Sequence, residues 1–89
     1  MKDTLIGLVK ALVDNPTDVA VTESTQDGRT VFTVSVNPQD MGKIIGKGGR
    51  IIRAVRDLMK ILATKKGVYI DVVIAEDYPE GQAVEPSNQ

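Results

Sequence analysis

The chain has 89 residues, of which 42% are hydrophobic and 26% charged, so its composition is that of one small globular domain and excludes a disordered or coiled-coil chain. The absence of Cys and His excludes disulfides, zinc fingers, thiolate nucleophiles and imidazole bases, and we expect no enzyme, no cofactor, no metal and no small-molecule substrate. Apolar runs are short and interrupted by charges, and the N-terminal residues lack a signal-peptide cleavage pattern, so we expect a cytoplasmic protein without a membrane span.

The first half of the chain predicts a helix followed by two strands. Residues 3–14 carry an amphipathic pattern that stops at Asn15-Pro16. Residues 18–24 and 29–36 alternate apolar with other side chains, and the Asp27-Gly28 pair between them is typical of a hairpin turn, so we expect these strands to pair antiparallel. The apolar side chains expected on the core side are Leu5, Leu8, Val9, Leu12, Val13, Val19, Val21, Phe32, Val34 and Val36.

The second half predicts two helices and a strand. Asn37-Pro38 begins a short helix that runs to about Ile45, and a longer helix begins near Arg50 and ends at Lys65-Lys66-Gly67, where cations and a C-cap glycine suit its terminus. Residues 68–75 form the most apolar strand. The side chains expected to face the core are Ile51, Ile52, Val55, Leu58, Met59 and Leu62 in the long helix and Ile70, Val72 and Ile74 in the strand. We expect one domain over residues 1–77 and a flexible acidic tail over residues 78–89, where no periodicity remains.

Charge is strongly segregated along the chain although the net charge is only -1. Eight of the eleven basic residues lie between Met41 and Gly67, where Asp57 is the one acidic residue, so this stretch carries a net charge of +7. A local positive field attracts a polyanion even when the whole molecule is nearly neutral. The alternative is that these cations form a solvated helix face, and for Lys60, Lys65 and Lys66 we favour helix-end and solubility charges.

The glycine-rich segment Gly46-Lys47-Gly48-Gly49 lies inside the basic stretch, directly before the long helix. Glycines allow close backbone approach, and the free amides at a helix start bind phosphate, which points to a phosphate-binding loop. It is not a Walker loop, because three residues separate Gly42 from Gly46 and Lys47 precedes Gly48, and a dinucleotide fingerprint would need glycine where Ile51 stands.

The stretch from Ile44 to Ile52 is similar to the I-G-x-x-G-x-x-I signature of KH domains, and the order of predicted elements resembles the type II, prokaryotic KH topology. This resemblance implies an α+β fold: a single type II KH domain in the order α-β-β-α-α-β, with a three-stranded mixed sheet and three helices packed on one face. Era-like GTPases, elongation factors of the NusA kind and the ribosomal protein with this fold carry further domains, so we expect a stand-alone KH protein. The stretch from Asn37 to Lys47 is similar to the small bacterial single-KH proteins of the KhpA family.

The family resemblance implies an RNA-binding protein that holds single-stranded RNA with low sequence specificity, in a groove formed by the GKGG loop, its flanking helices and the last strand. It also implies a post-transcriptional regulator or RNA chaperone that pairs, in some bacteria, with a second KH protein of the Jag (KhpB) type in cell-wall, cell-shape and division regulation. The candidate RNA-binding residues are Lys43, Ile45, Gly46, Lys47, Gly48, Gly49, Arg50, Ile52 and Arg53. Strand backbone near Val72 or Val73 is a candidate partner of the bases, against plain core packing of these two residues, which we favour.

Two alternatives stay open at this point. Ile45 and Ile52 are candidates for base contacts, against plain core packing, which we favour for both. Ala54 and Ile61 lie at the border of the apolar stripe of the long helix and are candidates for a homodimer or heterodimer surface, against simple packing at the stripe's edge. The chain is then a protein-interaction module as well as, or instead of, an RNA-binding one.

Overall fold

The computed structural model describes residues 1–75. The expected domain end at residue 77 and the expected acidic tail over residues 78–89 therefore lie outside the described residues. Within residues 1–75, no helix combines the length and the apolar character needed to cross a membrane.

The order of elements is helix, strand, strand, helix, helix, strand, as the sequence predicts. Each boundary falls within about two residues of its expected place except the start of α2, because Pro38–Asp40 form a 3-10 turn before it. Short 3-10 turns precede β1, α2 and α3. The elements are α1 (Lys2–Leu12), β1 (Ala20–Gln26), β2 (Arg29–Ser35), α2 (Met41–Ile45), α3 (Arg50–Lys66) and β3 (Tyr69–Ile74).

The three strands form a mixed sheet in the order β1-β2-β3. β1 and β2 pair antiparallel through a two-residue turn, in which both Asp27 and Gly28 have positive φ, the conformation that matches the twist of a tight hairpin. β3 pairs parallel to β2, with Arg29 opposite Tyr69 and Val34 opposite Ile74. Within residues 1–75, β3 is consequently an edge strand, and no other described strand pairs with its second side.

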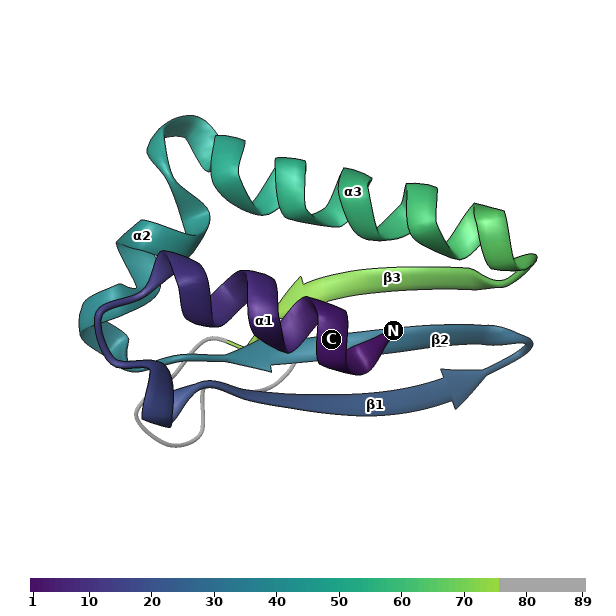
Figure 1. The fold of residues 1–89 in the computed structure, drawn as a ribbon, viewed down its shortest axis with the longest axis horizontal. Helices are drawn as coiled ribbons and strands as arrows, with labels where there is room; N and C mark the ends of the chain where they lie inside the picture. The colour runs from purple at the N-terminus through teal and green to yellow at the C-terminus, as the bar shows by residue number, and fades with distance from the viewer. Residues whose placement is uncertain (76–89) are drawn as a thin grey trace, which may run out of the picture.

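The helices lie on one face of this sheet, with α1 in front of the strands and α3 alongside β3, as Figure 1 shows. Both amphipathic helices bury the residues that their 3.6-residue period places on one side. The α+β architecture with three helices on one face of a mixed sheet is thus confirmed. The buried apolar core comprises Leu5, Val9, Val21, Phe32, Val34, Val36, Ile44, Val55, Met59, Ala63, Ile70 and Val72.

Two side chains expected in the core are exposed. Leu58 is 43% exposed and Leu12 is 38% exposed. Leu58 follows Ala54 by four residues and precedes Ile61 by three, so these three side chains share one stripe of α3, rotated away from the buried stripe of Val55 and Met59. The prediction for Leu58 was wrong because hydrophobic periodicity identifies an apolar side of a helix but not how much of that side the neighbouring elements cover.

Asp40 is buried among the apolar residues, at 1% exposure, and it fastens the chain that follows α1 to the start of α2. Its carboxylate accepts hydrogen bonds from the backbone N–H of Asp14 at 3.2 Å, and from the backbone and side-chain N–H groups of Asn15 at 3.0 and 3.1 Å. Burial by itself would raise the pKa of this carboxyl, but those hydrogen bonds and the charge of Lys43 hold the pKa below its usual value. The carboxylate thereby fixes α2, and the loop after it, relative to α1.

Candidate nucleic-acid interface

The glycine loop connects α2 to α3 as a sharp turn in which Gly46, Gly48 and Gly49 all have positive φ. α2 ends when the Gly46 N–H donates to the Gly42 carbonyl at 2.9 Å, and the Gly49 N–H donates to the Gly46 carbonyl at 3.1 Å. Three glycines in four positions are therefore explained by backbone conformation, because L-residues rarely adopt this region.

Gly46 has a second, steric reason to be glycine. A Cβ at this position would lie 2.6 Å from Cγ1 and 2.9 Å from Cβ of Ile51, distances that real Cβ atoms essentially never show. By contrast, a Cβ at Gly48 or Gly49 would meet nothing within 4 Å. The first glycine thus serves the packing of the loop on α3, whereas the last two leave backbone open at the surface.

The tip of the loop is exposed. Lys47 and Gly48 both lie at the surface, and a Cβ at Gly48 would meet nothing within 4 Å, so the backbone of a ligand is able to approach the main chain closely there. The loop leads directly into the first turn of α3, where further N–H groups and the positive end of the helix dipole favour an anion. Together with the Lys47 ammonium group, these features have the chemistry that suits the oxygens of a phosphate.

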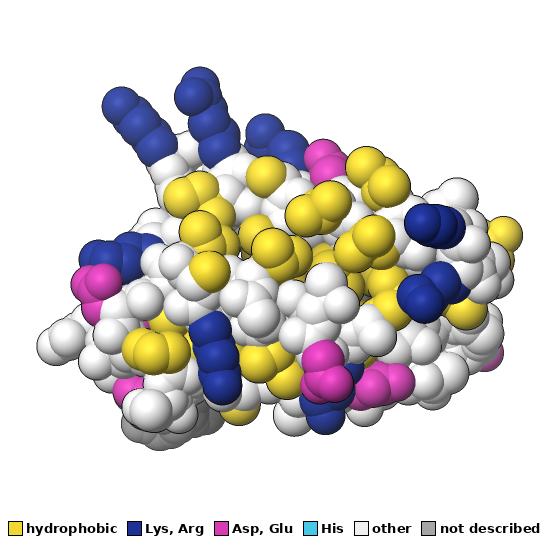
Figure 2. All heavy atoms as spheres, in the orientation of Figure 1, with side chains coloured by type: hydrophobic (Ala, Val, Ile, Leu, Met, Phe, Trp, Pro, Cys, Tyr) yellow, Lys and Arg dark blue, Asp and Glu magenta, His cyan; other side chains and the backbone are white. Residues whose placement is uncertain are grey.

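Basic side chains surround this turn but do not all have the same role. Figure 2 shows Lys and Arg side chains projecting over the α2–α3 turn and the first part of α3. Lys47, Arg50 and Arg53 are exposed, and Arg50 also lines an apolar groove on the α1 side of α3. Lys43 forms an ion pair with Asp14 at 3.3 Å, so this candidate RNA-binding side chain is already engaged at the end of α1.

The free edge of β3 lies beside α3, and at this edge the backbone N–H and carbonyl of Val72 form hydrogen bonds with side chains. In a parallel ladder alternate residues bond to the neighbouring strand. The Ala75 N–H donates to the Val34 carbonyl at 2.8 Å, so the backbone polar groups of Val73, two residues earlier, also point toward β2. Those of Val72 therefore point toward the free edge. There Arg56 Nε donates to the Val72 carbonyl at 3.1 Å, and the Val72 N–H donates to the Asp71 carboxylate at 2.9 Å. A base that reaches this edge has to compete with Arg56, which the sequence did not indicate.

The two isoleucines proposed for base contacts differ in their packing. Ile45 and Ile52 are both half-buried. Ile52 packs against the buried core, together with its neighbour Ile51. Ile45 is outside that cluster and lies next to Gly46, so of the two its exposed part is the better placed to meet a ligand at the loop.

A comparison with protein families matches residues 2–74 to the KH domain of KhpA and KhpB. Several proteins named RNA-binding protein KhpA are similar to this chain over nearly their whole length. The chain is 38% identical to the one from Listeria monocytogenes over 85% of this chain and all of the relative, and 41% identical to the one from Clostridium acetobutylicum over 82% of this chain and all of the relative. The relative from Chlamydia caviae is 39% identical over 86% of this chain and 99% of its own length.

Among solved structures, the fold is similar to part of the Era protein from Aquifex aeolicus, crystallised with GDP and aluminium fluoride, at a TM-score of 0.57 and 18% sequence identity. The match covers 79% of this chain but only 27% of that protein, so it bears on the fold alone. The fold, the glycine loop between α2 and α3 and the relatives agree with one another, and they also agree with the expectation that the chain is not an enzyme. The chain belongs to the KhpA/KhpB family of KH-domain proteins.

Proposed function

We propose that this protein binds single-stranded RNA through the glycine loop and the adjoining part of α3, with low sequence specificity. The observation that carries the proposal is the exposed glycine turn at Lys47 and Gly48, which is lined with cations and leads directly into the first turn of α3. Its relatives are named RNA-binding proteins, which supports RNA as the polyanion. Acting on cytoplasmic RNA in this way, the protein serves as a post-transcriptional regulator or RNA chaperone.

The contacts follow from what each group offers. The loop amides and the Lys47 ammonium group bind the phosphates, and Arg50 and Arg53 supply further positive charge. The close backbone approach that Gly48 and Gly49 allow brings the phosphodiester chain onto the loop. Bases then lie against Ile45 and toward the edge of β3, where Arg56 takes part in any hydrogen bonding.

Weak sequence preference and moderate affinity are expected from this set of contacts. Most of them go to phosphate, which carries no sequence information. With about three or four phosphates neutralised, the slope of log K against log salt is about -2 to -3 on the single-strand scale of about -0.7 per phosphate.

The test is fluorescence anisotropy with a labelled single-stranded RNA, comparing the parent with the double variant Lys47→Asp plus Gly48→Asp at two salt concentrations. Asp tolerates the positive φ of position 48 and there is open space around it, so the variant is expected to fold. We expect its affinity to fall by more than about tenfold, because the two tip residues then repel phosphate.

A matched control makes the same changes of residue type elsewhere. Gly7 and Lys10 lie on the exposed side of α1, and a Cβ at Gly7 meets nothing within 4 Å. The variant Gly7→Asp plus Lys10→Asp alters the net charge equally and is expected to bind RNA nearly as the parent does. Equal binding by parent and loop variant, with both folded by circular dichroism, would refute the loop as the RNA site.

A second candidate function is protein association through the apolar stripe of α3 next to α1. Ile61 is 64% exposed, and an apolar groove of about 410 Å³ lies between the two helices, lined by side chains that include Leu12, Ala54 and Leu58. Figure 2 shows apolar side chains gathered over α1 and α3. We propose that this stripe pairs with a second copy of the chain or with a second KH protein of the KhpB type, because contiguous exposed apolar patches mark interaction sites.

Light scattering coupled to size-exclusion chromatography tests the homodimer. We expect Ile61→Asp to shift a parent dimer to monomer while the circular dichroism spectrum is kept. Val68→Asp is the matched control, because Val68 is also exposed, at 45%, but follows the end of α3. A parent dimer that Ile61→Asp leaves intact places the interface elsewhere.

A further inference from the structure

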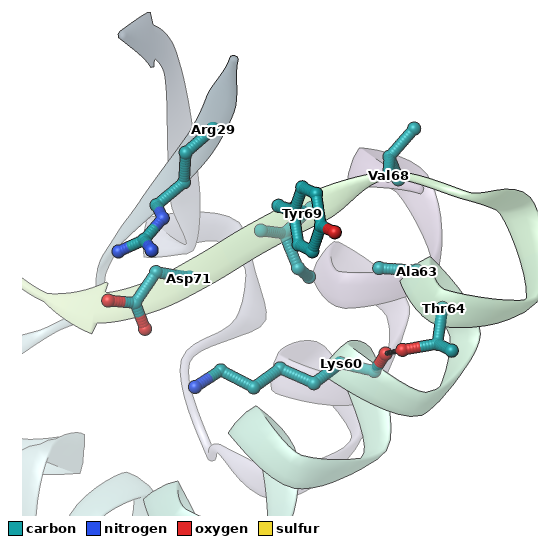
Figure 3. Close-up of a pocket in the computed structure, with 8 residues that line it drawn as sticks. Arg29, Lys60, Ala63, Thr64, Val68, Tyr69 and Asp71 are labelled. Carbon is teal, nitrogen blue, oxygen red and sulfur yellow. Dashed lines mark hydrogen bonds between the residues drawn. The ribbon is translucent and has the colours of Figure 1, made fainter. Parts of the chain in front are cut away.

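A polar pocket lies at the opposite end of α3 from the glycine loop, between the last turns of this helix and the beginning of β3. It has a volume of about 220 Å³, and its lining includes Arg29, Lys60, Thr64, Tyr69 and Asp71. Figure 3 shows these side chains around the start of β3, with Lys60 on the α3 side, Arg29 on the β2 side and Tyr69 between them. Neither the sequence patterns nor the loop accounts for this arrangement.

Tyr69 is the most unusual member of the pocket. At 75% it is more exposed than any other large apolar side chain that the structure describes. An exposed aromatic ring flanked by cations is a platform on which nucleic-acid bases stack, and stacking tolerates every base because each has a π face. The alternative is a strand residue that merely faces solvent. That alternative accounts for the exposed tyrosine but not for the two cations, Arg29 and Lys60, that line the same pocket.

The charges around Tyr69 suit a nucleotide. In Figure 3 the charged ends of Arg29 and Lys60 lie on either side of the Asp71 carboxylate, next to the Tyr69 ring, and in a nucleic-acid strand a phosphate precedes and follows each base. Asp71 would repel a phosphate, but its carboxylate already accepts the Val72 N–H at 2.9 Å and lies 3.8 Å from Arg56 Nε. The remaining acceptor capacity of this carboxylate favours the edge of a base that carries N–H donors.

A line of basic side chains joins the glycine loop to this pocket. Arg53, Arg56 and Lys60 are spaced by three and four residues, so they share one side of α3, the side that faces the free edge of β3 through the Arg56 contact with Val72. From the first residue of α3 to Lys60 the helix rises about 15 Å. The apolar stripe of Ala54, Leu58 and Ile61 lies on another side of the same helix and is not part of this path.

We propose that the pocket is a second nucleotide-binding subsite, which takes a base of the same RNA strand that the glycine loop holds. The base stacks on Tyr69, and Lys60 and Arg29 bind the phosphates on either side of it. The inference rests on the proposed function for the strand itself, and it extends the RNA path along α3 to the start of β3. The same chemistry suits a free nucleotide. The experiment below therefore distinguishes a nucleotide within the bound RNA strand from a free nucleotide.

The experiment measures anisotropy with a labelled tetranucleotide and a labelled decanucleotide of one repeated base. A longer RNA also offers more binding registers, so the deciding comparison is between protein variants on the decanucleotide. We expect Tyr69→Ala to weaken decanucleotide binding between about 5- and 150-fold, the contribution of one stacked base, and to leave the tetranucleotide affinity unchanged. Tyr69→Phe keeps the ring and is expected to bind as the parent does, whereas Lys60→Ala weakens the decanucleotide alone.

A fluorescence measurement reports on the ring directly. Tyr69 and Tyr78 are the two tyrosines and the chain has no Trp, so a Tyr78→Phe background leaves Tyr69 as the emitter. We expect the decanucleotide to quench this emission, and the tetranucleotide and free adenosine monophosphate to leave it nearly unchanged at the same concentrations.

The outcomes separate the subsite from the loop. If the parent and Tyr69→Ala bind the decanucleotide equally while the loop double variant loses binding, the subsite is refuted and the loop stands. If neither RNA binds the parent, both proposals fall. Quenching by free adenosine monophosphate as strong as that by the decanucleotide, and unaffected by the loop variant, would overturn the continuous RNA path.

Discussion

Gly46 and Gly48 give a sharp test of the loop geometry, because the same substitution meets two different surroundings. Both residues have positive φ, at 76° and 65°, so alanine is strained at either position, by about 1–2 kcal/mol in the left-handed region of Gly48 and by about 1–3 kcal/mol at Gly46, whose ψ is 172°. Only at Gly46 does the new Cβ collide with Ile51, at 2.6 Å from Cγ1 and 2.9 Å from Cβ. Relief of such an overlap costs a further 1–3 kcal/mol, roughly, in a packed region.

We therefore expect Gly46→Ala to lower the free energy of unfolding by about 2–6 kcal/mol, and Gly48→Ala by about 1–2 kcal/mol. Urea denaturation followed by circular dichroism measures both free energies of unfolding. If the slope of the free energy against urea concentration is the same in each variant as in the parent, the denatured state is unchanged. For a small domain whose total stability is of order 5–10 kcal/mol, the first variant loses a large part of it.

A second substitution isolates the contact. Ile51→Ala removes two of the three Ile51 atoms that the Cβ at position 46 would meet and leaves the one at 2.9 Å. We expect Gly46→Ala to cost less in an Ile51→Ala background than in the parent, an interaction energy that a double-mutant cycle measures. Equal losses for Gly46→Ala and Gly48→Ala would refute the reasoning, because the collision would then contribute nothing.

Two further predictions concern buried polar contacts. The lowered pKa of Asp40 means that its ionised form stabilises the fold above pH 3.8, the usual value, and that this contribution is lost as the pH falls through the lower native pKa. Urea midpoints measured from pH 7 to pH 3 should therefore fall less steeply at the acid end for Asp40→Asn than for the parent; parallel curves would contradict the assignment. Arg56→Ala removes the hydrogen bond to the Val72 carbonyl, and we expect a loss of about 1 kcal/mol in urea denaturation at neutral pH, whereas no loss would show that the bond contributes nothing in solution.

The core contacts and the two proposed functions of the protein use different sides of α3. One side carries the core residues Val55 and Met59, and the flank toward β3 carries Arg56 and Lys60. The flank toward α1 carries the apolar stripe that includes Ile61. The proposed RNA path and the proposed association surface lie on different flanks except at Arg50, which is proposed to bind RNA and also lines the apolar groove. If both proposals hold, one copy of the chain binds RNA and a protein partner at the same time, which raises avidity when two copies hold one strand.

The sequence by itself determined the order of the elements, their bounds and the place of the glycine loop. These features rest on local signals that act over a few residues. Asn37 caps the turn before α2 by accepting the Gln39 N–H, Gly67 ends α3 in the left-handed region, and the Asp27-Gly28 pair closes the hairpin. The residues that form these caps and turns need no partner far away in the sequence, so the sequence pattern alone predicts where the elements begin and end.

Tertiary structure alone decided which side chains work together. The carboxylate of Asp40 holds groups 25 and 26 residues away, and Arg56 reaches a carbonyl 16 residues away. Tyr69 joins Lys60 and Arg29 because β3 returns beside both α3 and β2. The exposure of Leu58 likewise depends on how far α1 extends over α3. Periodicity assigns a residue to one side of its own element, but the neighbour it meets there is fixed only by packing among elements that are distant in the chain.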